Sequence, residues 1–150
     1  MRISFDVDDT LVCGPATPCE QFVSRWRRWV YHEPMRWGTR DLMHELVTRR
    51  CDIWIYTTSF RPARYLNGWF RALGVQLGGV VNQHRHDRLL RRSDFGNEYP
   101  PSKYPRAYGI DLHVDDSEGV AEEGRRFGFR VLVVSPDDES WASKVLAAVR

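Results

Sequence analysis

Cysteine is scarce in this sequence, and its few copies are not spaced as pairs. The 150 residues include three cysteines, Cys13, Cys19 and Cys51. An odd count without close pairing is not typical of a disulfide framework. A chain of this length buries enough apolar surface to fold without disulfides or a structural metal. We therefore expect residues 1–150 to form one domain.

Long apolar runs are also lacking. No stretch approaches the roughly 20 apolar residues of a transmembrane helix. The N-terminus reaches Asp6 and its acidic neighbours too early for a secretory signal peptide. No repeat, low-complexity tract or linker interrupts the chain. These absences predict a cytoplasmic protein that does not enter a membrane.

A strong excess of charge of one sign is lacking too, since the net charge is +2. The whole molecule therefore has no strong attraction to nucleic acid. The charge is uneven, however. The stretch 84–92 holds one aspartate, Asp87, and four arginines: Arg85, Arg88, Arg91 and Arg92. We expect a solvated basic loop there, and a contact with substrate phosphate or with nucleic acid is the weaker alternative.

Apolar periodicity predicts alternating strands and helices. Strands are expected at 2–6, 52–57, 79–82, 110–114 and 130–135, and helices at 39–49, 62–73, 118–127 and 141–149. This alternation predicts an α/β fold, with a three-layer, Rossmann-like parallel sheet and helices on both faces. Ligands of such sheets bind beyond the carboxyl ends of the strands.

The segment 14–38, which we call the flap, has two interpretations. Its apolar spacing over 22–30 suits an amphipathic helix, whereas its flanking prolines also suit a small hairpin over the site. It is too short to be a separate cap domain. Trp26, Trp29 and Trp37 are expected to pack in the core rather than to form a lip for the substrate.

Two carboxylates, Asp6 and Asp8, directly follow the first predicted strand. Hydrolysis of a phosphate monoester is very slow without catalysis, and a carboxylate nucleophile divides it into two steps through an aspartyl-phosphate. A second carboxylate can protonate the leaving oxygen and then activate water. Attack by one anion on another needs positive charge, which a divalent metal and a lysine supply. Magnesium prefers carboxylates, carbonyls and waters as ligands.

Further candidates for this chemistry follow later strands. Thr57 and Thr58 come after the second strand and can donate hydroxyl groups to phosphate. Lys103 lies in a proline-flanked loop, and Asp115 and Asp116 follow the fourth strand. Because strands of a parallel sheet end at one edge, these residues are expected to lie together.

In this order the motifs resemble those of the haloacid dehalogenase-like (HAD) phosphatase superfamily. Its first motif, Asp-x-Asp-x-Thr after an apolar strand, matches residues 3–10. Its second motif, a Thr or Ser that ends a strand, matches Thr57. Lys103 matches the third motif, and the acidic pair at 115–116 matches the fourth. The resemblance covers about residues 2–135, and four motifs in order are far more specific than one.

This resemblance implies different roles for the aspartates. Asp6 would be the nucleophile and a metal ligand. Asp8 would be the general acid/base, and its backbone carbonyl would bind the metal. Asp115 would bind the metal directly, and Asp116 directly or through water, which makes Mg²⁺ the expected cofactor. Asp9 has no assigned role.

The resemblance also implies that Thr57 and Lys103 hold the transferred phosphoryl group. If the strand register shifts, Thr58 or Ser59 takes the place of Thr57, and Arg106 is a nearby competitor of Lys103. A HAD-like fold without a full cap domain would leave the site open. That geometry resembles enzymes acting on large or exposed phosphate esters, although small substrates are also known.

Other candidates are weaker. His84 and His86 resemble part of the zinc site of heptose bisphosphate phosphatases, but no cysteine follows Cys51, so the ligand count fails and exposed loop histidines are expected. Arg61 and Arg64 follow the second motif closely and are candidates for a contact with substrate phosphate.

The sequence therefore predicts a Mg²⁺-dependent phosphomonoester hydrolase acting on a phosphorylated substrate. A nucleotide or nucleic-acid-end phosphatase is one alternative, which the basic loop and the aromatic residues would serve. A protein or sugar phosphatase, or transfer to an acceptor other than water, also stays open. A non-catalytic HAD-like binding or regulatory domain is the alternative of another class. A receiver domain fits poorly, because its lysine follows the last strand of the group. The physiological substrate and the oligomeric state stay open.

Overall fold

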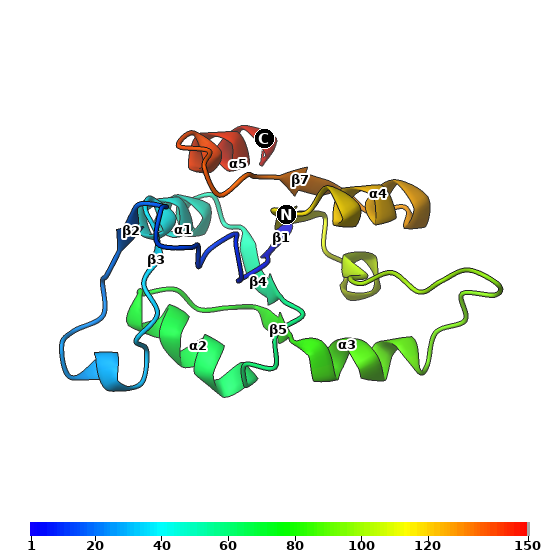
Figure 1. Ribbon diagram of the computed structural model, residues 1–150, viewed down its shortest axis with the longest axis horizontal. Coiled ribbons are helices and arrows are strands. Elements are labelled where there is room, and N and C mark those ends of the chain that lie inside the picture. The colour runs from blue at the N-terminus through cyan, green and yellow to red at the C-terminus, as the bar shows by residue number, and fades with distance from the viewer. Residues whose placement is uncertain (150) are drawn as a thin grey trace.

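A five-stranded parallel sheet, in the order β5-β4-β1-β6-β7, forms the centre of the computed structural model, which describes residues 1–149 (Figure 1). Its strands are β1 (Arg2–Phe5), β4 (Asp52–Tyr56), β5 (Gly79–Val81), β6 (Leu112–Asp115) and β7 (Val131–Val133). Each strand pairs in parallel with its neighbours. The predicted α/β fold class is confirmed.

Alternate strand residues face opposite sides of the sheet, and each side is covered by helices. On one side the main core packs against α1 (Thr39–Thr48), α2 (Ala63–Ala72) and α5 (Trp141–Ala148). On the other side lie α3 (Gln83–Leu90), the 3₁₀ helix η2 (Pro105–Tyr108) and α4 (Glu118–Phe127) (Figure 1). The molecule therefore has the three layers expected of a Rossmann-like fold.

The register of the central strand β1 aligns the ends of three strands. Phe5 is opposite Ile55 of β4 and opposite Val114 of β6. Asp6 and Asp115 therefore lie opposite each other at the ends of β1 and β6. Thr57 follows the end of β4, one residue further along. This edge holds the carboxyl ends of the strands, where ligands of such sheets bind.

The flap forms a hairpin rather than the alternative amphipathic helix. Its strands β2 (Cys19–Glu20) and β3 (Met35–Arg36) pair antiparallel, and the short 3₁₀ helix η1 (Arg27–Trp29) lies between them. The chain has to reverse its direction between β2 and β3, and the helical part of this connection is limited to η1. No full cap domain is present among residues 1–149.

The flap tryptophans do not pack in the core, so that expectation was wrong. Trp26, Trp29 and Trp37 are 69%, 90% and 65% exposed. The core contacts of the flap are instead made by smaller apolar side chains such as Val23 and Met35, which are buried.

The basic stretch 84–92 was expected to be a loop, and this was also wrong. Most of it forms α3, because the side chain of Asn82 caps the helix by accepting a hydrogen bond from the backbone N–H of Arg85. His86 is buried on this helix and is not a solvated loop histidine. No helix within residues 1–149 combines the length and the apolar character needed to cross a membrane.

Candidate active site

Asp6 lies immediately beyond β1 at the centre of the sheet. Its backbone N–H donates to the carbonyl of Val114 at 2.9 Å, so pairing with β6 continues through it. The chain then turns sharply, since the N–H groups of Leu11 and Val12 both donate to the carbonyl of Val7. Asp9 completes this turn with a φ of 57°, a left-handed conformation that aspartate tolerates better than most residues. The turn keeps the first motif at the carboxyl edge of the sheet.

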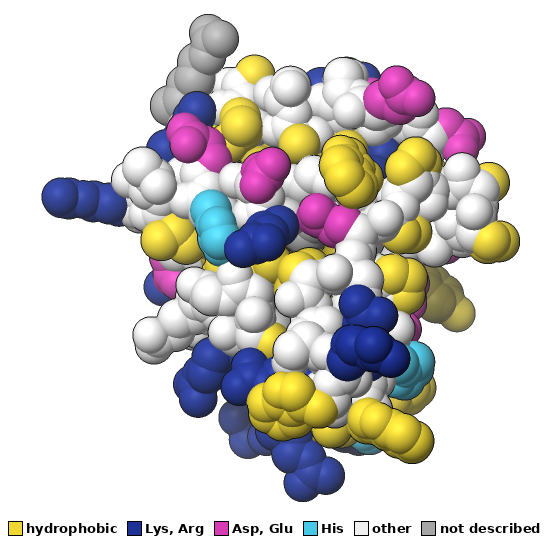
Figure 2. All heavy atoms as spheres, turned by 90° about the vertical axis from the view of Figure 1, so that its left-hand side faces the viewer, with side chains coloured by type: hydrophobic (Ala, Val, Ile, Leu, Met, Phe, Trp, Pro, Cys, Tyr) yellow, Lys and Arg dark blue, Asp and Glu magenta, His cyan; other side chains and the backbone are white. Residues whose placement is uncertain are grey.

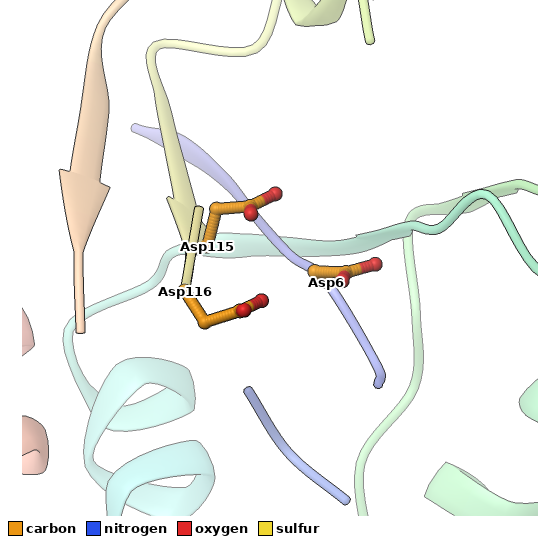
Figure 3. A group of neighbouring side chains, drawn as sticks. All are labelled: Asp6, Asp115 and Asp116. Carbon is orange, nitrogen blue, oxygen red and sulfur yellow. The ribbon is translucent and has the colours of Figure 1, made fainter. Parts of the chain in front are cut away.

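Three carboxylates converge at this edge. Asp6, Asp115 and Asp116 each offer an oxygen within 4.8 Å of the others, and Figure 3 shows them extending to the same side from neighbouring strand ends. Burial raises the pKa of Asp6, and the charge of Asp115 adds to the effect against the opposing charge of Lys103. Burial and the charge of Asp115 also raise the pKa of Asp116. Such a cluster could hold a metal ion.

Lys103 supplies positive charge inside this cluster. It is 3% exposed, and its Nζ donates to Asp115 Oδ2 at 2.5 Å. Nζ also lies 3.1 Å from Asp6 Oδ1, as an ion pair without hydrogen-bond geometry. Asp6 Oδ1 is therefore a buried carboxylate oxygen without a hydrogen bond from the described residues. Arg106, the competitor of Lys103, is exposed on η2.

A buried hydrogen-bond chain behind Asp115 was not predicted from the sequence. His113 Nε2 lies 2.8 Å from Asp115 Oδ2, and its Nδ1 lies 2.8 Å from Ser4 Oγ. Burial lowers the pKa of His113, so the ring is neutral. Burial opposes ionisation of Asp115, but the hydrogen bond from His113 and the charge of Lys103 bring its pKa well below the usual value.

The shifted pKa values of His113 and Asp115 show which atoms carry the protons in this hydrogen-bond chain. The ionised Asp115 accepts from Nε2–H, and the free Nδ1 accepts from the Ser4 hydroxyl. The signal in the sequence was a polar residue between two apolar neighbours in each of two strands. Only the register, which places Ser4 opposite His113, makes them partners.

A second unpredicted cluster holds the Lys103 loop against the sheet. The backbone N–H of Tyr104 donates to Tyr56 Oη at 2.8 Å, and the Tyr56 hydroxyl donates to His86 Nδ1 at 2.7 Å. Burial raises the pKa of Tyr56 and lowers that of His86, so both groups are neutral. β4 and α3 together therefore position the residue next to Lys103.

Hydroxyl groups of the second motif differ in burial. Thr57 is fully buried, and its Oγ1 accepts from the backbone N–H of Ser59 at 3.2 Å. Ser59 Oγ is buried and has no hydrogen-bond partner among the described residues. Thr58 is exposed and lines a shallow hollow of about 330 Å³ with Tyr99 and α3. Thr57 and Ser59 are thus the buried hydroxyls of this motif.

Asp8 is held by Arg61, which also holds the flap. Arg61 Nη1 and Nη2 donate to the two Asp8 oxygens at 2.9 and 2.8 Å. Nη2 and Nε donate to the oxygens of Glu33, a flap residue, at 2.6 and 3.1 Å. The hydrogen bonds to Glu33 and Asp8 raise the pKa of Arg61, and those from Arg61 lower the pKa of Glu33. The role of Arg61 in joining these loops was not predicted, and Arg64 is exposed on α2.

Among solved structures, the chain is similar to hydrolases of the HAD superfamily. A haloacid dehalogenase-like family hydrolase from Streptococcus pneumoniae is 13% identical with a TM-score of 0.56, over 99% of this chain and 98% of that one. A HAD-superfamily hydrolase of subfamily IA, variant 1, from Geobacter sulfurreducens is 14% identical with a TM-score of 0.53, over 88% of each chain. A predicted HAD-like family hydrolase from Porphyromonas gingivalis is 11% identical with a TM-score of 0.50, over 99% and 97%.

This similarity shows that the chain has a HAD-like fold. No protein-family model matches the sequence, and no curated protein matches it. The chemistry of the site is therefore inferred from its own residues.

Proposed function

We propose that this protein is a Mg²⁺-dependent phosphate monoester hydrolase that forms an aspartyl-phosphate on Asp6. The observation that carries the proposal is the environment of the Asp6 carboxylate. It is buried at the carboxyl edge of a HAD-like sheet, has one oxygen without a hydrogen bond, and lies beside a buried lysine and two further carboxylates. A polar atom buried without a partner is costly in a structural core, whereas it suits a reacting group.

The reaction is proposed to take two steps. An oxygen of Asp6 attacks the phosphorus, the bond from phosphorus to the ester oxygen breaks, and Asp8, released from Arg61 and in its protonated form, gives its proton to the leaving oxygen. A water molecule then attacks the phosphorus of the aspartyl-phosphate while Asp8 takes a proton from that water. The bond from phosphorus to Asp6 breaks, inorganic phosphate leaves, and both aspartates return to their starting states.

The carboxylates of the site would repel an anionic substrate unless cations compensate their negative charge. The Lys103 ammonium has three protons and uses one for its hydrogen bond to Asp115, so it can also donate to a phosphoryl oxygen. The hydroxyls of Thr57 and Ser59 lie in the same motif, and the Ser59 hydroxyl lacks a partner among the described residues.

The donor set also suits magnesium. Hard carboxylate oxygens of Asp6, Asp115 and Asp116, with the backbone carbonyl of Asp8, are the groups that would hold Mg²⁺. When bound, the ion would supply positive charge for the phosphoryl oxygens. Asp6 Oδ1 accepts no hydrogen bond from the described residues, although Lys103 Nζ lies 3.1 Å away, so it would be free to bind the ion.

Asp8 cannot act while both of its oxygens accept from Arg61. A proton donor or acceptor needs at least one oxygen directed at the substrate or the water, so the contact with Arg61 has to open partly during turnover. Arg61 is thus proposed to hold Asp8 in place and to release it when substrate binds.

Hydrolysis of p-nitrophenyl phosphate by the purified protein, with Mg²⁺ or with EDTA, tests the proposal. We expect activity with Mg²⁺ only, and its loss in Asp6→Asn. Asp8→Asn should still be phosphorylated by this reactive substrate but hydrolyse the intermediate slowly, so mass spectrometry should detect one added phosphoryl group. Asp9→Asn is the matched control, because Asn also tolerates the left-handed backbone at that position.

Two results would contradict the proposal. One is a wild-type protein that hydrolyses no phosphate ester with Mg²⁺, which would favour a non-catalytic binding domain. The other is an Asp6→Asn variant that keeps full activity.

A further inference from the structure

The tip of the flap, residues 24–32, combines arginine and tryptophan without any acidic residue. It reads Ser-Arg-Trp-Arg-Arg-Trp-Val-Tyr-His, and the first acid after it is Glu33. Residues 24–30 are all exposed. Because this run contains two indole rings and three positive charges, it is unlike an ordinary solvated turn, which is built from small polar residues.

The two indole rings of the flap tip are available to a ligand. Trp29 is 90% exposed, and Trp26 is 69% exposed with the Arg27 guanidinium 4.8 Å from its ring centroid. Trp29 lines a shallow hollow of about 340 Å³ together with Arg25, Arg28 and His32. Clustered exposed aromatics of this size mark interaction surfaces more often than scattered apolar residues do.

Basic and apolar side chains gather on the same part of the surface. Figure 2 shows Lys/Arg and hydrophobic side chains together over the lower part of this face, where the flap lies, whereas most of the Asp/Glu side chains visible on it lie in the upper part. This part of the surface therefore has a local positive field, although the net charge of the protein is only +2.

The C-terminal end of the flap tip is anchored to α2 and, through Glu33, to Arg61. Tyr31 packs on Tyr65 of α2 with ring centroids 5.3 Å apart, and a Cβ on Gly68 would lie 2.0 Å from the Tyr31 hydroxyl oxygen, so the ring fits only against a glycine. Glu33 follows the tip directly and is bonded to Arg61, which in turn holds Asp8. The tip is therefore tied to a residue of the catalytic motif.

We propose that the flap tip binds a single-stranded nucleic acid, and that the site removes a phosphate from the end of such a strand. This inference rests on the proposed phosphatase function and names its substrate class. Arginine charges compensate backbone phosphates, and exposed indoles stack on bases of any sequence. Because arginine and tryptophan are interspersed within one short turn, the tip offers partners for both the phosphates and the bases of a strand.

Other ligands use only part of this surface. A small phosphorylated metabolite would leave the indoles without a partner, and a phosphopeptide lacks a series of stackable bases. A membrane surface would favour a longer amphipathic helix with its apolar residues on one face. Here η1 has three residues, and arginines flank Trp26 on both sides and precede Trp29.

Fluorescence anisotropy with a fluorescein-labelled single-stranded oligonucleotide tests the binding. The Asp6→Asn variant of the full chain is used so that the strand end is not altered. Adding Trp26→Ala and Trp29→Ala should weaken binding at least tenfold, since stacking is lost for two bases. The combination Arg25→Gln, Arg27→Gln and Arg28→Gln should weaken binding and reduce the slope of log K against log salt by about 2, or about 0.7 per lost phosphate contact.

Matched controls separate the flap tip from general effects of charge and aromaticity. Trp37→Ala removes an exposed tryptophan outside the tip, and Arg40→Gln, Arg71→Gln and Arg125→Gln together remove three exposed charges elsewhere. These controls should bind the strand within about twofold of the parent. In the wild-type background, the tip variants should hydrolyse p-nitrophenyl phosphate normally, which also shows that they fold.

Each outcome decides the proposal. Equal binding by tip variants and parent overturns it, as does binding to phosphatidylcholine/phosphatidylserine vesicles without binding to the strand. Aryl phosphatase activity without strand binding refutes this inference alone. Strand binding through the tip without any phosphatase activity refutes the proposed function and the end-processing role, while it supports the binding surface.

Discussion

Arg61 is predicted to anchor the flap mainly through Glu33 and only weakly through Asp8. The side chains of Arg61 and Glu33 are 19% and 22% exposed, whereas that of Asp8 is 51% exposed. A hydrogen bond to a charged group that is largely buried contributes about 1.5–3 kcal/mol. An ion pair with an exposed carboxylate contributes about 0.2–1 kcal/mol. The Glu33 contact should therefore dominate.

A pair of double-mutant cycles measures the two contacts. Arg61→Ala combined with Glu33→Ala should give a coupling energy of about 1.5–3 kcal/mol, and Arg61→Ala combined with Asp8→Ala about 1 kcal/mol or less. Urea denaturation reports the global free energy of unfolding. Hydrogen exchange at the amides of Arg36 and Trp37, which donate to the carbonyls of Leu11 and Pro18, reports opening of the flap base.

The pH dependence provides a second test of the same contact. Because the hydrogen bond from Arg61 lowers the pKa of Glu33, the folded state binds this proton less tightly than the unfolded state. The stabilisation is complete above the unfolded pKa of about 4.3 and is lost as the pH falls through the lower folded value. Arg61→Ala should remove this part of the acid dependence. Equal coupling to Asp8 and Glu33, or none to Glu33, would refute the reasoning.

Three further predictions concern the core of the site and the sheet. Since burial raises the pKa of Asp6, its charged form is disfavoured in the folded state, and stability falls as the pH rises through that pKa. Asp6→Asn, which we expect to be inactive, should therefore unfold at higher urea concentration than the wild type in EDTA at neutral pH. His113→Phe leaves Asp115 and the Ser4 hydroxyl without their buried partner and should cost about 2–5 kcal/mol in urea denaturation, part of which Ser4→Ala in the same variant should recover; no recovery would argue against the chain. Gly124→Ala should lower the melting temperature, because the new Cβ would lie 2.7 Å from the carbonyl oxygen of Phe129, and the gain in helix propensity of about 1 kcal/mol does not offset a backbone clash.

Much of the fold could be predicted from local patterns. The runs that became β1, β4 and β6 are short, apolar and end at polar residues, and parallel strands buried on both faces have this appearance. The helices α1, α2, α4 and α5 also followed from apolar spacing at helical period. α3 was missed because its surface is rich in arginine and its cap, Asn82, was not recognised.

The flap shows where local patterns fail. Apolar spacing over 22–30 suits a helix, and tryptophan is usually an interior residue. Neither the helical spacing nor the usual burial of tryptophan takes account of the return of the chain to β3. They also do not take account of the packing of Tyr31 on α2 or the pairing of Glu33 with Arg61. Those contacts join segments about 30 residues apart, so they could not be found from the segment alone.

By itself, the sequence predicted the residues of the candidate site and their order: Asp6 and Asp8, Thr57 and Thr58, Lys103, and the pair at 115–116. It did so because alternating strands and helices imply a parallel sheet, and the ends of its strands share one edge. Only the tertiary structure decided which partners each of them has. His113 and Ser4 hold Asp115, Tyr56 and His86 position the Lys103 loop, and Arg61 ties Asp8 to the flap, because strand register and helix packing bring together groups that are far apart along the chain.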